Sequence, residues 1–454
     1  MSAAPPSTRP TYAPSATTAL LTDMYELTML QASLADGTAG RHCVFEVFTR
    51  RLPPGRRYGV LAGVGRVLEA IADFRFTDAE LSWVSRAGVV DRATLDHLAR
   101  YRFTGTVTGY AEGECFFPGS PLLLVEGTFA DAVILETVVL SVLNYDSAVA
   151  SAASRMTSAA AGRPCLEMGS RRAHEQAAVA AARAAVIAGF DGTSNLEAGR
   201  RYGLRTIGTA AHSFTLLHDD ERTAFRAQVD AHGPGTTLLV DTYDVARGVA
   251  TAVEVAGLGL GAVRIDSGDL IAQAQEVRDQ LDALGARGTR IVVSSDLDEY
   301  AIAALAASPV DSYGVGTSVV TGSGAPTCGM VYKLVAREGA DGTLQPVAKA
   351  AARKGSTGGR KVAARRVDVT GTAVEEVVIS GDDDAVARWA PANGDLRPLH
   401  VPLVEHGAVD TRWTGAPGVA LAIQRHRTSL AELPRWARRL SAGDPALPTV
   451  GLTV

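Results

Sequence analysis

A histidine, His212, lies in the run GTAAHSF (208–214), directly after a short apolar-leaning segment at 205–207. The pattern predicts that this segment ends a strand and that His212 lies in the turn leading into a helix. In that position a histidine can act as a general base or as a nucleophile. The alternative is structural: a histidine at the start of a helix that bonds only a neighbouring residue.

An arginine, Arg264, lies inside the strand candidate AVRIDSGDL (262–270), two residues before Asp266. Alternation along a strand points both side chains to the same face. An inward guanidinium is costly unless it meets an anion or a carboxylate. Two interpretations follow: a buried ion pair with Asp266, or a receptor that holds the carboxylate of a ligand through two parallel hydrogen bonds.

Strand candidates that end in polar residues recur between residues 164 and 335. They end near Met168, Ile207, Val240, Ile265, Val293 and Tyr313. The spacing, roughly twenty to forty residues, is that of repeated strand–helix units in a parallel sheet. Polar chemistry at the ends of successive parallel strands is how an α/β barrel builds an active site. The sequence therefore predicts an irregular parallel α/β barrel, with a doubly wound sheet as the alternative.

Acidic and glycine-rich positions accompany these strand ends. The aspartates are Asp241, Asp244, Asp266 and Asp269. They could orient a ribose or a magnesium-bound diphosphate, or each could simply cap a helix. The loop GVGTS (314–318) follows the last strand candidate, where barrels commonly hold phosphate on free backbone N–H groups. It is not a Walker A loop, because no GK[ST] follows.

Outside the predicted barrel the pattern changes to short alternating strands with Gly and Pro turns, as in residues 101–129, which suggests a β-rich domain. We expect a disordered tail at 1–18, an N-terminal β-rich domain at 19–140, the barrel at 141–340, and a C-terminal region at 341–454 that packs on the N-terminal domain.

The net charge, the cysteine spacing and the length of the apolar runs narrow the class of protein. The 454 residues carry a formal charge of −5, which argues against non-specific nucleic-acid binding. The four cysteines show no CxxC spacing, which favours neither a zinc site nor a disulfide framework and fits a reducing cytoplasm. No run of eighteen apolar residues occurs, so we expect no membrane span.

Taken together, the segments resemble the nicotinate phosphoribosyltransferase family over about residues 19–335. The matching pieces, in family order, are LLTDMYELTM (20–29), FEVFTRRLPPGRRYGVLAGV (45–64), GSRRAHEQAA (169–178), GFDGTSN (189–195), GTAAHSF (208–214), LLVDTYD (238–244), RIDSGDL (264–270), VVSSDLDE (292–299) and GVGTSVVTG (314–322). The segments VPLVEHG (401–407) and PTVGLT (448–453) also look family-like.

The resemblance implies a β-rich domain plus an irregular barrel, usually as a homodimer. It implies transfer of phosphoribosyl from phosphoribosyl diphosphate, with Mg²⁺, to nicotinate in NAD salvage, coupled to ATP hydrolysis through a phosphohistidine at His212. The implied nicotinate contacts are Tyr25, Thr209 and Arg264. The implied phosphoribosyl diphosphate contacts are Arg171, Gly316, Thr317 and Ser318. Asp241 and Asp266 match acidic positions near the ribose and the histidine.

One segment departs from the family pattern. AKAAARKGSTGGRK (348–361) has Gly358 where proline is common and alanines where a serine is common, although Lys349, Lys354 and Lys361 remain. An ATP or phosphate role for this segment therefore competes with a plain exposed basic loop.

Other functions fit less well. A nicotinamide-using relative would carry an EHS-type histidine sequence, whereas this chain has AAHS. Quinolinate phosphoribosyltransferases are shorter and lack the TDMYELT segment. A non-catalytic paralogue that binds pyridine metabolites would be expected to lose part of the set His212, Arg264, Tyr25 and Thr317. An aldolase-type barrel would need a lysine on a strand, and none of the strand candidates carries one.

Overall fold

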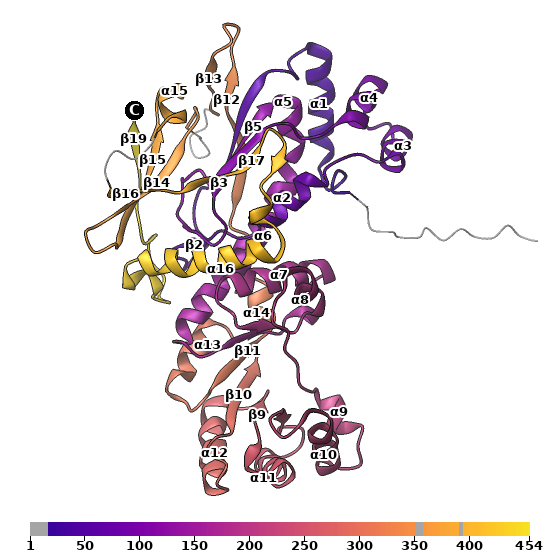
Figure 1. The fold of residues 1–454 in the computed structure, drawn as a ribbon, viewed down its shortest axis with the longest axis vertical. Helices are drawn as coiled ribbons and strands as arrows, with labels where there is room; N and C mark the ends of the chain where they lie inside the picture. The colour runs from indigo at the N-terminus through magenta and orange to yellow at the C-terminus, as the bar shows by residue number, and fades with distance from the viewer. Residues whose placement is uncertain (1–16, 350–356, 390–393) are drawn as a thin grey trace, which may run out of the picture.

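The computed structural model describes residues 17–349, 357–389 and 394–454. It consists of two bodies arranged along the long axis of the molecule (Figure 1). One body is built on an antiparallel sheet of seven strands. Their order is β13 (Leu344–Pro346), β12 (Met330–Glu338), β1 (His42–Thr49), β5 (Leu123–Thr128), β3 (Thr106–Tyr110), β17 (His400–Glu405) and β18 (Ala408–Val409).

The other body is built on a curled parallel sheet of six strands. Their order is β7 (Gly192–Thr193), β6 (Cys165–Glu167), β11 (Ser312–Val315), β10 (Arg290–Ser295), β9 (Ala262–Ile265) and β8 (Thr237–Leu239). Every pairing is parallel. No ladder joins β8 to β7 within the described residues, so the sheet is an open part of a barrel. The α/β class is thus confirmed, whereas barrel closure is not seen.

Helices connect the parallel strands. They are α7 (Glu175–Ile187), α8 (Leu196–Tyr202), α9 (His212–Leu216), α10 (Glu221–His232), α11 (Val245–Ala256), α12 (Leu270–Ala283), α13 (Glu299–Ala304) and α14 (Thr317–Val320). Several begin at an aspartate whose side chain accepts a backbone N–H, as Asp220 does for α10. Such caps fix where each helix starts, and hence where the preceding loop points its side chains.

The expected strand ending at Ile207 does not form. Residues 203–211 are irregular apart from a single bridge between Thr206 and Thr193. The apolar run there is too short to bury a strand on both faces, and Gly203 and Gly208 flank it. His212 therefore begins a helix, as expected, but follows a loop and not a strand.

Chain segments far apart in sequence build the antiparallel body. β12 falls inside the range expected for the barrel, yet it pairs with β1 from Cys43–Arg337 to Thr49–Met330. β17 adds to the other side of the sheet through β3. A separate sheet contains β16 (Leu396–Pro398), β14 (Val362–Val367), β15 (Ala373–Ser380) and β19 (Thr449–Thr453). The remaining elements are β2 (Gly59–Val60), β4 (Cys115–Phe116), α1 (Met24–Asp36), α2 (Val64–Ala72), α3 (Asp78–Arg86), α4 (Arg92–Arg100), α5 (Phe129–Ala132), α6 (Glu136–Ala159), α15 (Asp383–Ala387) and α16 (Gly415–Glu432).

At the predicted tail boundary, Thr18 already belongs to the fold: its hydroxyl donates to Ala70 O at 2.6 Å. Residues 1–16 of the predicted tail lie outside the described residues.

A buried ion pair joins the small sheet to the segment just before β4. Arg365 on β14 is fully buried and contacts Glu114 Oε1 and Glu376 Oε1, both at 2.7 Å. Burial raises the pKa of Glu114, but the charges of Arg365 and Arg397 outweigh it and lower that pKa to about 2. Removing one partner of such a buried ion pair destabilises the folded protein, because the other charge is then buried without a partner.

The basic stretch near residue 360 is partly internal as well. Lys361 is buried, and its Nζ lies 2.9 Å from Glu46 Oε2 on β1. Lys349 is exposed, and Lys354 lies outside the described residues. Lys361 is therefore engaged in the fold and not in an exposed loop.

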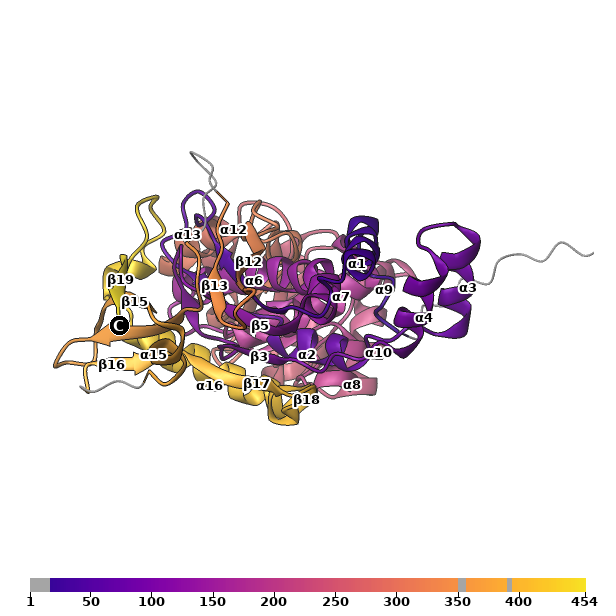
Figure 2. The same cartoon turned by 90° about the horizontal axis from the view of Figure 1, so that it is seen from above.

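A long apolar helical stretch runs through the centre of the molecule. Phe129–Ala159 is long and apolar enough to cross a membrane by length and composition, but 67% of its most apolar window is buried inside the protein. α6 lies between the two bodies and packs against α7 and α2 (Figures 1 and 2). Its apolar character is thus used in the core.

Candidate active site

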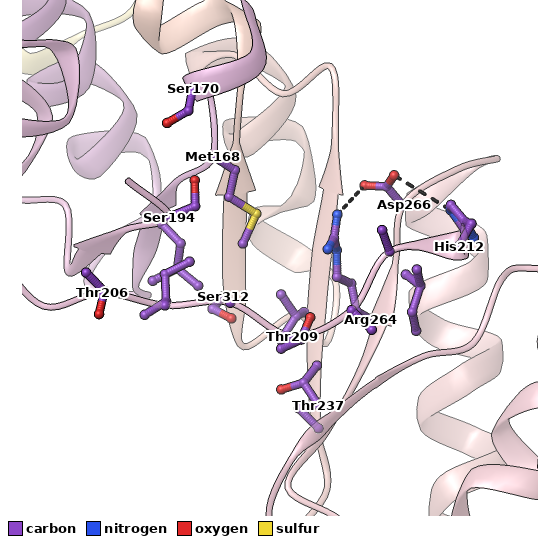
Figure 3. A pocket seen from close by; sticks show the side chains of 18 of the residues that line it. Met168, Ser170, Ser194, Thr206, Thr209, His212, Thr237, Arg264, Asp266 and Ser312 are labelled. Carbon is purple, nitrogen blue, oxygen red and sulfur yellow. Dashed lines mark hydrogen bonds and ion pairs between the residues drawn. The ribbon is translucent and has the colours of Figure 1, made fainter. Parts of the chain in front are cut away.

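The concave side of the parallel sheet encloses a cavity of about 730 Å³. Its walls come from strands β6, β8, β9, β10 and β11 and from the irregular segment 205–211 (Figure 3). That segment crosses the open side of the sheet, where a closed barrel would have another strand. Arg264, Asp266, Thr209 and His212 all line this cavity, so four sequence-predicted residues meet in one place.

Arg264 is held in a fixed orientation by two partners. Its Nε donates to Ser294 Oγ at 2.7 Å, and its Nη2 donates to Asp266 Oδ1 at 3.0 Å. Nε and Nη2 form one edge of the planar guanidinium. The end formed by Nη1 and the second hydrogen of Nη2 has no hydrogen-bond partner within the described part of the chain. The side chain is 15% exposed, which leaves that end open to the cavity.

The ion pair between Arg264 and Asp266, one of the two interpretations of the sequence, is therefore present. It occupies only part of the guanidinium. Ser294 also donates to the same Asp266 oxygen. Burial raises the pKa of Asp266, but the hydrogen bond from Ser294 and the charge of Arg264 outweigh it and hold that pKa below the ordinary value. Asp266 is thus a carboxylate at neutral pH, and the free end of Arg264 remains available for a second anion.

His212 lies beside this pair at the start of α9. Its Nδ1 is 3.1 Å from Thr242 Oγ1. Its Nε2 faces two carboxylates, with Asp241 Oδ1 at 3.8 Å and Asp266 Oδ2 at 4.0 Å. The ring is 39% exposed, so a ligand can reach it. Carboxylates on one side of an imidazole favour the tautomer that carries its proton on that side.

The four candidate aspartates divide into two pairs. Asp244 accepts from Arg247 N at 2.8 Å and caps α11. Asp269 caps α12 in the same way. Asp241, by contrast, is buried and uses Oδ2 to accept from Asp266 N at 2.8 Å. Its Oδ1 is buried without a hydrogen-bond partner and points toward His212.

A smaller hollow of about 230 Å³ adjoins the cavity at the carboxyl ends of the strands. Both spaces share Met168, Arg171, Arg264 and Asp266 as lining residues. The hollow adds Gly316 and Thr317 from the glycine-rich loop. Ser318, expected alongside them, lines neither space, because it lies in the turn of α14 after Thr317.

Tyr25 does not reach this site within one chain. It lies on α1 at the opposite end of the molecule from β9 and α9 (Figure 1). Its side chain is 44% exposed. Burial, followed by the charges of Glu136 and Glu26, raises the pKa of Tyr25 to about 12, so the phenol stays neutral.

Sequence reasoning missed two site residues. Ser294 fixes Arg264, and Thr242 bonds His212. Ser294 lies in the segment VVSSDLDE at the end of β10, and Thr242 lies in the segment LLVDTYD just after β8. Their position at a strand end was the available signal, but a serine or threonine has no distinctive chemistry until its partner is known.

No group of three or more His, Cys, Asp or Glu side chains with metal-binding geometry occurs in residues 17–349, 357–389 and 394–454. Asp266 and Asp296 line the smaller hollow, and Asp241 lies beside Asp266 and His212. A divalent cation bound here would need most of its oxygen ligands from a substrate, as Mg²⁺ commonly has.

Known proteins share both the sequence and the fold. A family profile described as the nicotinate phosphoribosyltransferase (NAPRTase) N-terminal domain matches residues 20–144. Nicotinate phosphoribosyltransferase pncB1 of Mycobacterium tuberculosis is 57% identical over 440 residues, covering 95% of this chain and 94% of the relative. The Bacillus subtilis nicotinate phosphoribosyltransferase is 36% identical, covering 75% of this chain and 72% of the relative. The crystal structure of human nicotinic acid phosphoribosyltransferase superimposes with a TM-score of 0.80 at 28% identity, covering 94% of this chain and 97% of that one. This chain belongs to the nicotinate phosphoribosyltransferase family.

Proposed function

We propose that this protein is a nicotinate phosphoribosyltransferase that joins nicotinate to phosphoribosyl diphosphate, giving nicotinate mononucleotide and diphosphate. The observation that carries the proposal is the free end of Arg264 inside a cavity that opens toward Arg171 and Thr317. A guanidinium end matches a carboxylate through two parallel hydrogen bonds. Thr209, in the irregular segment 205–211, supplies a hydroxyl that lines the same space.

The reaction follows from where the two substrates would sit. With the carboxylate on Arg264, the pyridine nitrogen faces the carboxyl ends of the strands, where Arg171, Gly316 and Thr317 suit the phosphates. The nitrogen forms a bond to C1 of the ribose while the bond from C1 to diphosphate breaks. Positive charge develops on the ribose, and the carboxylates of Asp266 and Asp241, which lie beside His212, would stabilise it there.

Mg²⁺ would neutralise the departing diphosphate. The carboxylates that could contribute to its binding are those of Asp241, Asp266 and Asp296, and the unpartnered Asp241 Oδ1 fits such a ligand. The remaining ligands would be diphosphate oxygens and water.

We also propose that ATP phosphorylates His212. Asp241 and Asp266 face Nε2 and favour a proton there, which makes Nδ1 the nucleophile once its lone pair gives up the hydrogen bond from Thr242 Oγ1. Nδ1 forms a bond to the γ-phosphorus while ADP leaves, and later hydrolysis releases phosphate. The added charge, about −1.5 to −2, in a cavity that Arg264 and Arg171 also line, would order the site around the diphosphate.

We propose that two copies of the chain complete each site. Leu21 and Met24, exposed by 59% and 62%, lie beside Tyr25 on or just before α1. Leu216 and Leu217, exposed by 61% and 77%, lie one turn after His212. In a twofold dimer, Leu21 and Met24 of each chain would cover Leu216 and Leu217 of the other chain, which buries both apolar pairs. This contact would bring Tyr25 of the partner subunit onto the nicotinate ring.

The four free, buried cysteines support a reducing, cytoplasmic location for this reaction.

The enzyme is expected to prefer nicotinate to nicotinamide. Replacing the carboxylate by an amide loses a charge-assisted contact of about 2–3 kcal/mol, or roughly thirty- to more than a hundredfold in kcat/KM. Initial rates with both substrates, each with and without ATP, measure this. Equal turnover of the two would contradict the role assigned to Arg264 and with it the proposed substrate.

A mixture of two inactive variants tests the shared site. Tyr25→Ala and His212→Ala dimers are each expected to have little activity with ATP. After subunit exchange, a hybrid dimer should contain one intact site and recover up to about a quarter of wild-type activity, since half of the dimers are hybrids and half of their sites are intact. Tyr25→Phe, which keeps the ring, is the matched control and should remain active. No recovery, with exchange shown by differently tagged subunits, would place Tyr25 outside the site.

A further inference from the structure

Glu167, the last residue of β6, is a buried carboxylate close to the turn that carries Arg171. It is fully buried, and no Lys, Arg or His nitrogen lies within ion-pair distance of it in the described part of the chain. Burial raises the pKa of Glu167 above its ordinary value, although hydrogen bonds from Thr193 and Gly169 lower it. Because a buried carboxylate without a cation is costly, packing alone does not account for a glutamate here.

Both oxygens of Glu167 accept hydrogen bonds from segments around this turn. Oε1 accepts from Gly169 N at 2.5 Å, and Oε2 accepts from Thr193 Oγ1 on β7. Thr193 Oγ1 in turn accepts from Asn195 N at 2.9 Å, and Asn195 Nδ2 donates to Ser170 Oγ at 3.1 Å. The carboxylate therefore holds the turn directly at Gly169 and, through this short chain of hydrogen bonds, at Ser170.

The position of Arg171 depends on its backbone turn, because its side chain has no partner of its own. Arg171 is exposed and makes no hydrogen bond or ion pair within residues 17–349, 357–389 and 394–454. The turn packs closely against the glycine-rich loop, since a methyl group at Gly169 would lie 2.8 Å from Gly316 O. Arg171 and Gly316 both line the hollow where the phosphates are proposed to bind. A shift of the turn would therefore change the width of that hollow.

Resting on the proposed function, we propose that Glu167 is a positioning residue for phosphoribosyl diphosphate. It acts through Arg171, by holding the turn at 169–172 where the guanidinium meets the diphosphate oxygens. Glutamine cannot replace it fully, because an amide presents one acceptor and one donor to Gly169 N–H and Thr193 O–H, which both donate. A displacement of about 1 Å in a binding group is enough for an effect of roughly a hundredfold.

The test is a double-mutant cycle on binding of phosphoribosyl diphosphate with Mg²⁺, measured by calorimetric titration without nicotinate and checked against KM. Glu167→Gln is expected to weaken binding by at least about fivefold and to leave KM for nicotinate within about twofold. In the Arg171→Ala background, the same change should weaken binding by less than about twofold, because the group that Glu167 positions is absent.

Glu221→Gln is the matched control, since Glu221 is another buried carboxylate in the parallel-sheet body, at the start of α10. It should leave binding of phosphoribosyl diphosphate within about twofold of wild type. Thr193→Val, which removes the hydrogen bond to Oε2, takes the place of Glu167→Gln if that variant does not fold.

The outcomes separate this inference from the proposed function. Equal weakening by Glu167→Gln in both backgrounds would overturn the inference, because the effect would then not pass through Arg171. Unchanged binding in Glu167→Gln would overturn it as well. A protein that binds phosphoribosyl diphosphate with the expected dependence on Glu167, but forms no nicotinate mononucleotide, would overturn the proposed function and leave the inference standing.

Discussion

His212→Ala is expected to lose ATP-dependent phosphate incorporation completely and, with it, all stimulation by ATP. The ring is accessible, begins α9, and presents Nδ1 opposite the side occupied by Asp241 and Asp266. Incubation of wild type with γ-labelled ATP should give one acid-labile, base-stable phosphate per chain. Slow transfer without ATP should persist, since Arg264 and the phosphate-binding end are untouched.

A second histidine on the same surface provides the control. His218 lies six residues further on, and its Nδ1 bonds the carbonyl of Phe214 at 2.8 Å. Its ring has no carboxylate within ion-pair distance in the described part of the chain. His218→Ala should therefore keep both the label and the ATP stimulation. A His212→Ala protein that still took up label, or that kept full ATP-stimulated activity, would show that His212 is structural.

The strands that carry the site could be predicted from sequence because each combines an apolar run with a polar exit. β9 is the clearest case: alternation alone placed Arg264 and Asp266 on one face, and both line the cavity. β8 and β10 follow the same pattern. These are local properties of the chain, so a sequence can express them.

Features that depend on contacts between distant segments could not be predicted. Nothing in Arg205-Thr206-Ile207 shows that it crosses an open sheet edge with a single bridge, since a short apolar segment suits a strand equally well. Nothing in MVYKLVARE shows that β12 joins β1 and not the parallel sheet, because pairing partners are chosen by the whole fold. For the same reason the distance between Tyr25 and the cavity emerged only in three dimensions.

Ser294 illustrates the limit within the site itself. A serine at a strand end could be predicted, but its hydrogen bonds to both Arg264 and Asp266 could not. Those bonds determine which end of the guanidinium is free. Under the proposed function, substrate choice would therefore depend on Ser294 as well as on Arg264.

Arg264→Ala is expected to lower kcat/KM for nicotinate by about 3–4 kcal/mol, roughly 10²- to 10³-fold, because the substrate carboxylate would be buried without its partner. For nicotinamide, which lacks that charge, the change should be much smaller. Steady-state rates with both substrates therefore separate loss of carboxylate recognition from general damage to the site.

The thermal stability of Arg264→Ala distinguishes a role of Arg264 in carboxylate recognition from a purely structural role. If the main task of Arg264 were its ion pair with Asp266, truncation would destabilise the protein by about 3–5 kcal/mol, as for a fully buried pair. However, Asp266 is 33% exposed and retains the hydrogen bond from Ser294, so solvent screens the pair and the carboxylate keeps a partner. We therefore expect thermal unfolding to shift by only a few degrees.

Arg290→Ala is the matched control, since Arg290 lines the same cavity one layer below Arg264. It should leave kcat/KM for nicotinate within about fivefold, because its backbone lies two strand residues, about 6.6 Å, below the level of Arg264. A large loss of stability in Arg264→Ala with an unchanged ratio of nicotinate to nicotinamide use would assign Arg264 to the fold. Equal kinetic losses in both arginine variants would show that the cavity attracts the anion as a whole, and that the free end of one guanidinium does not select it.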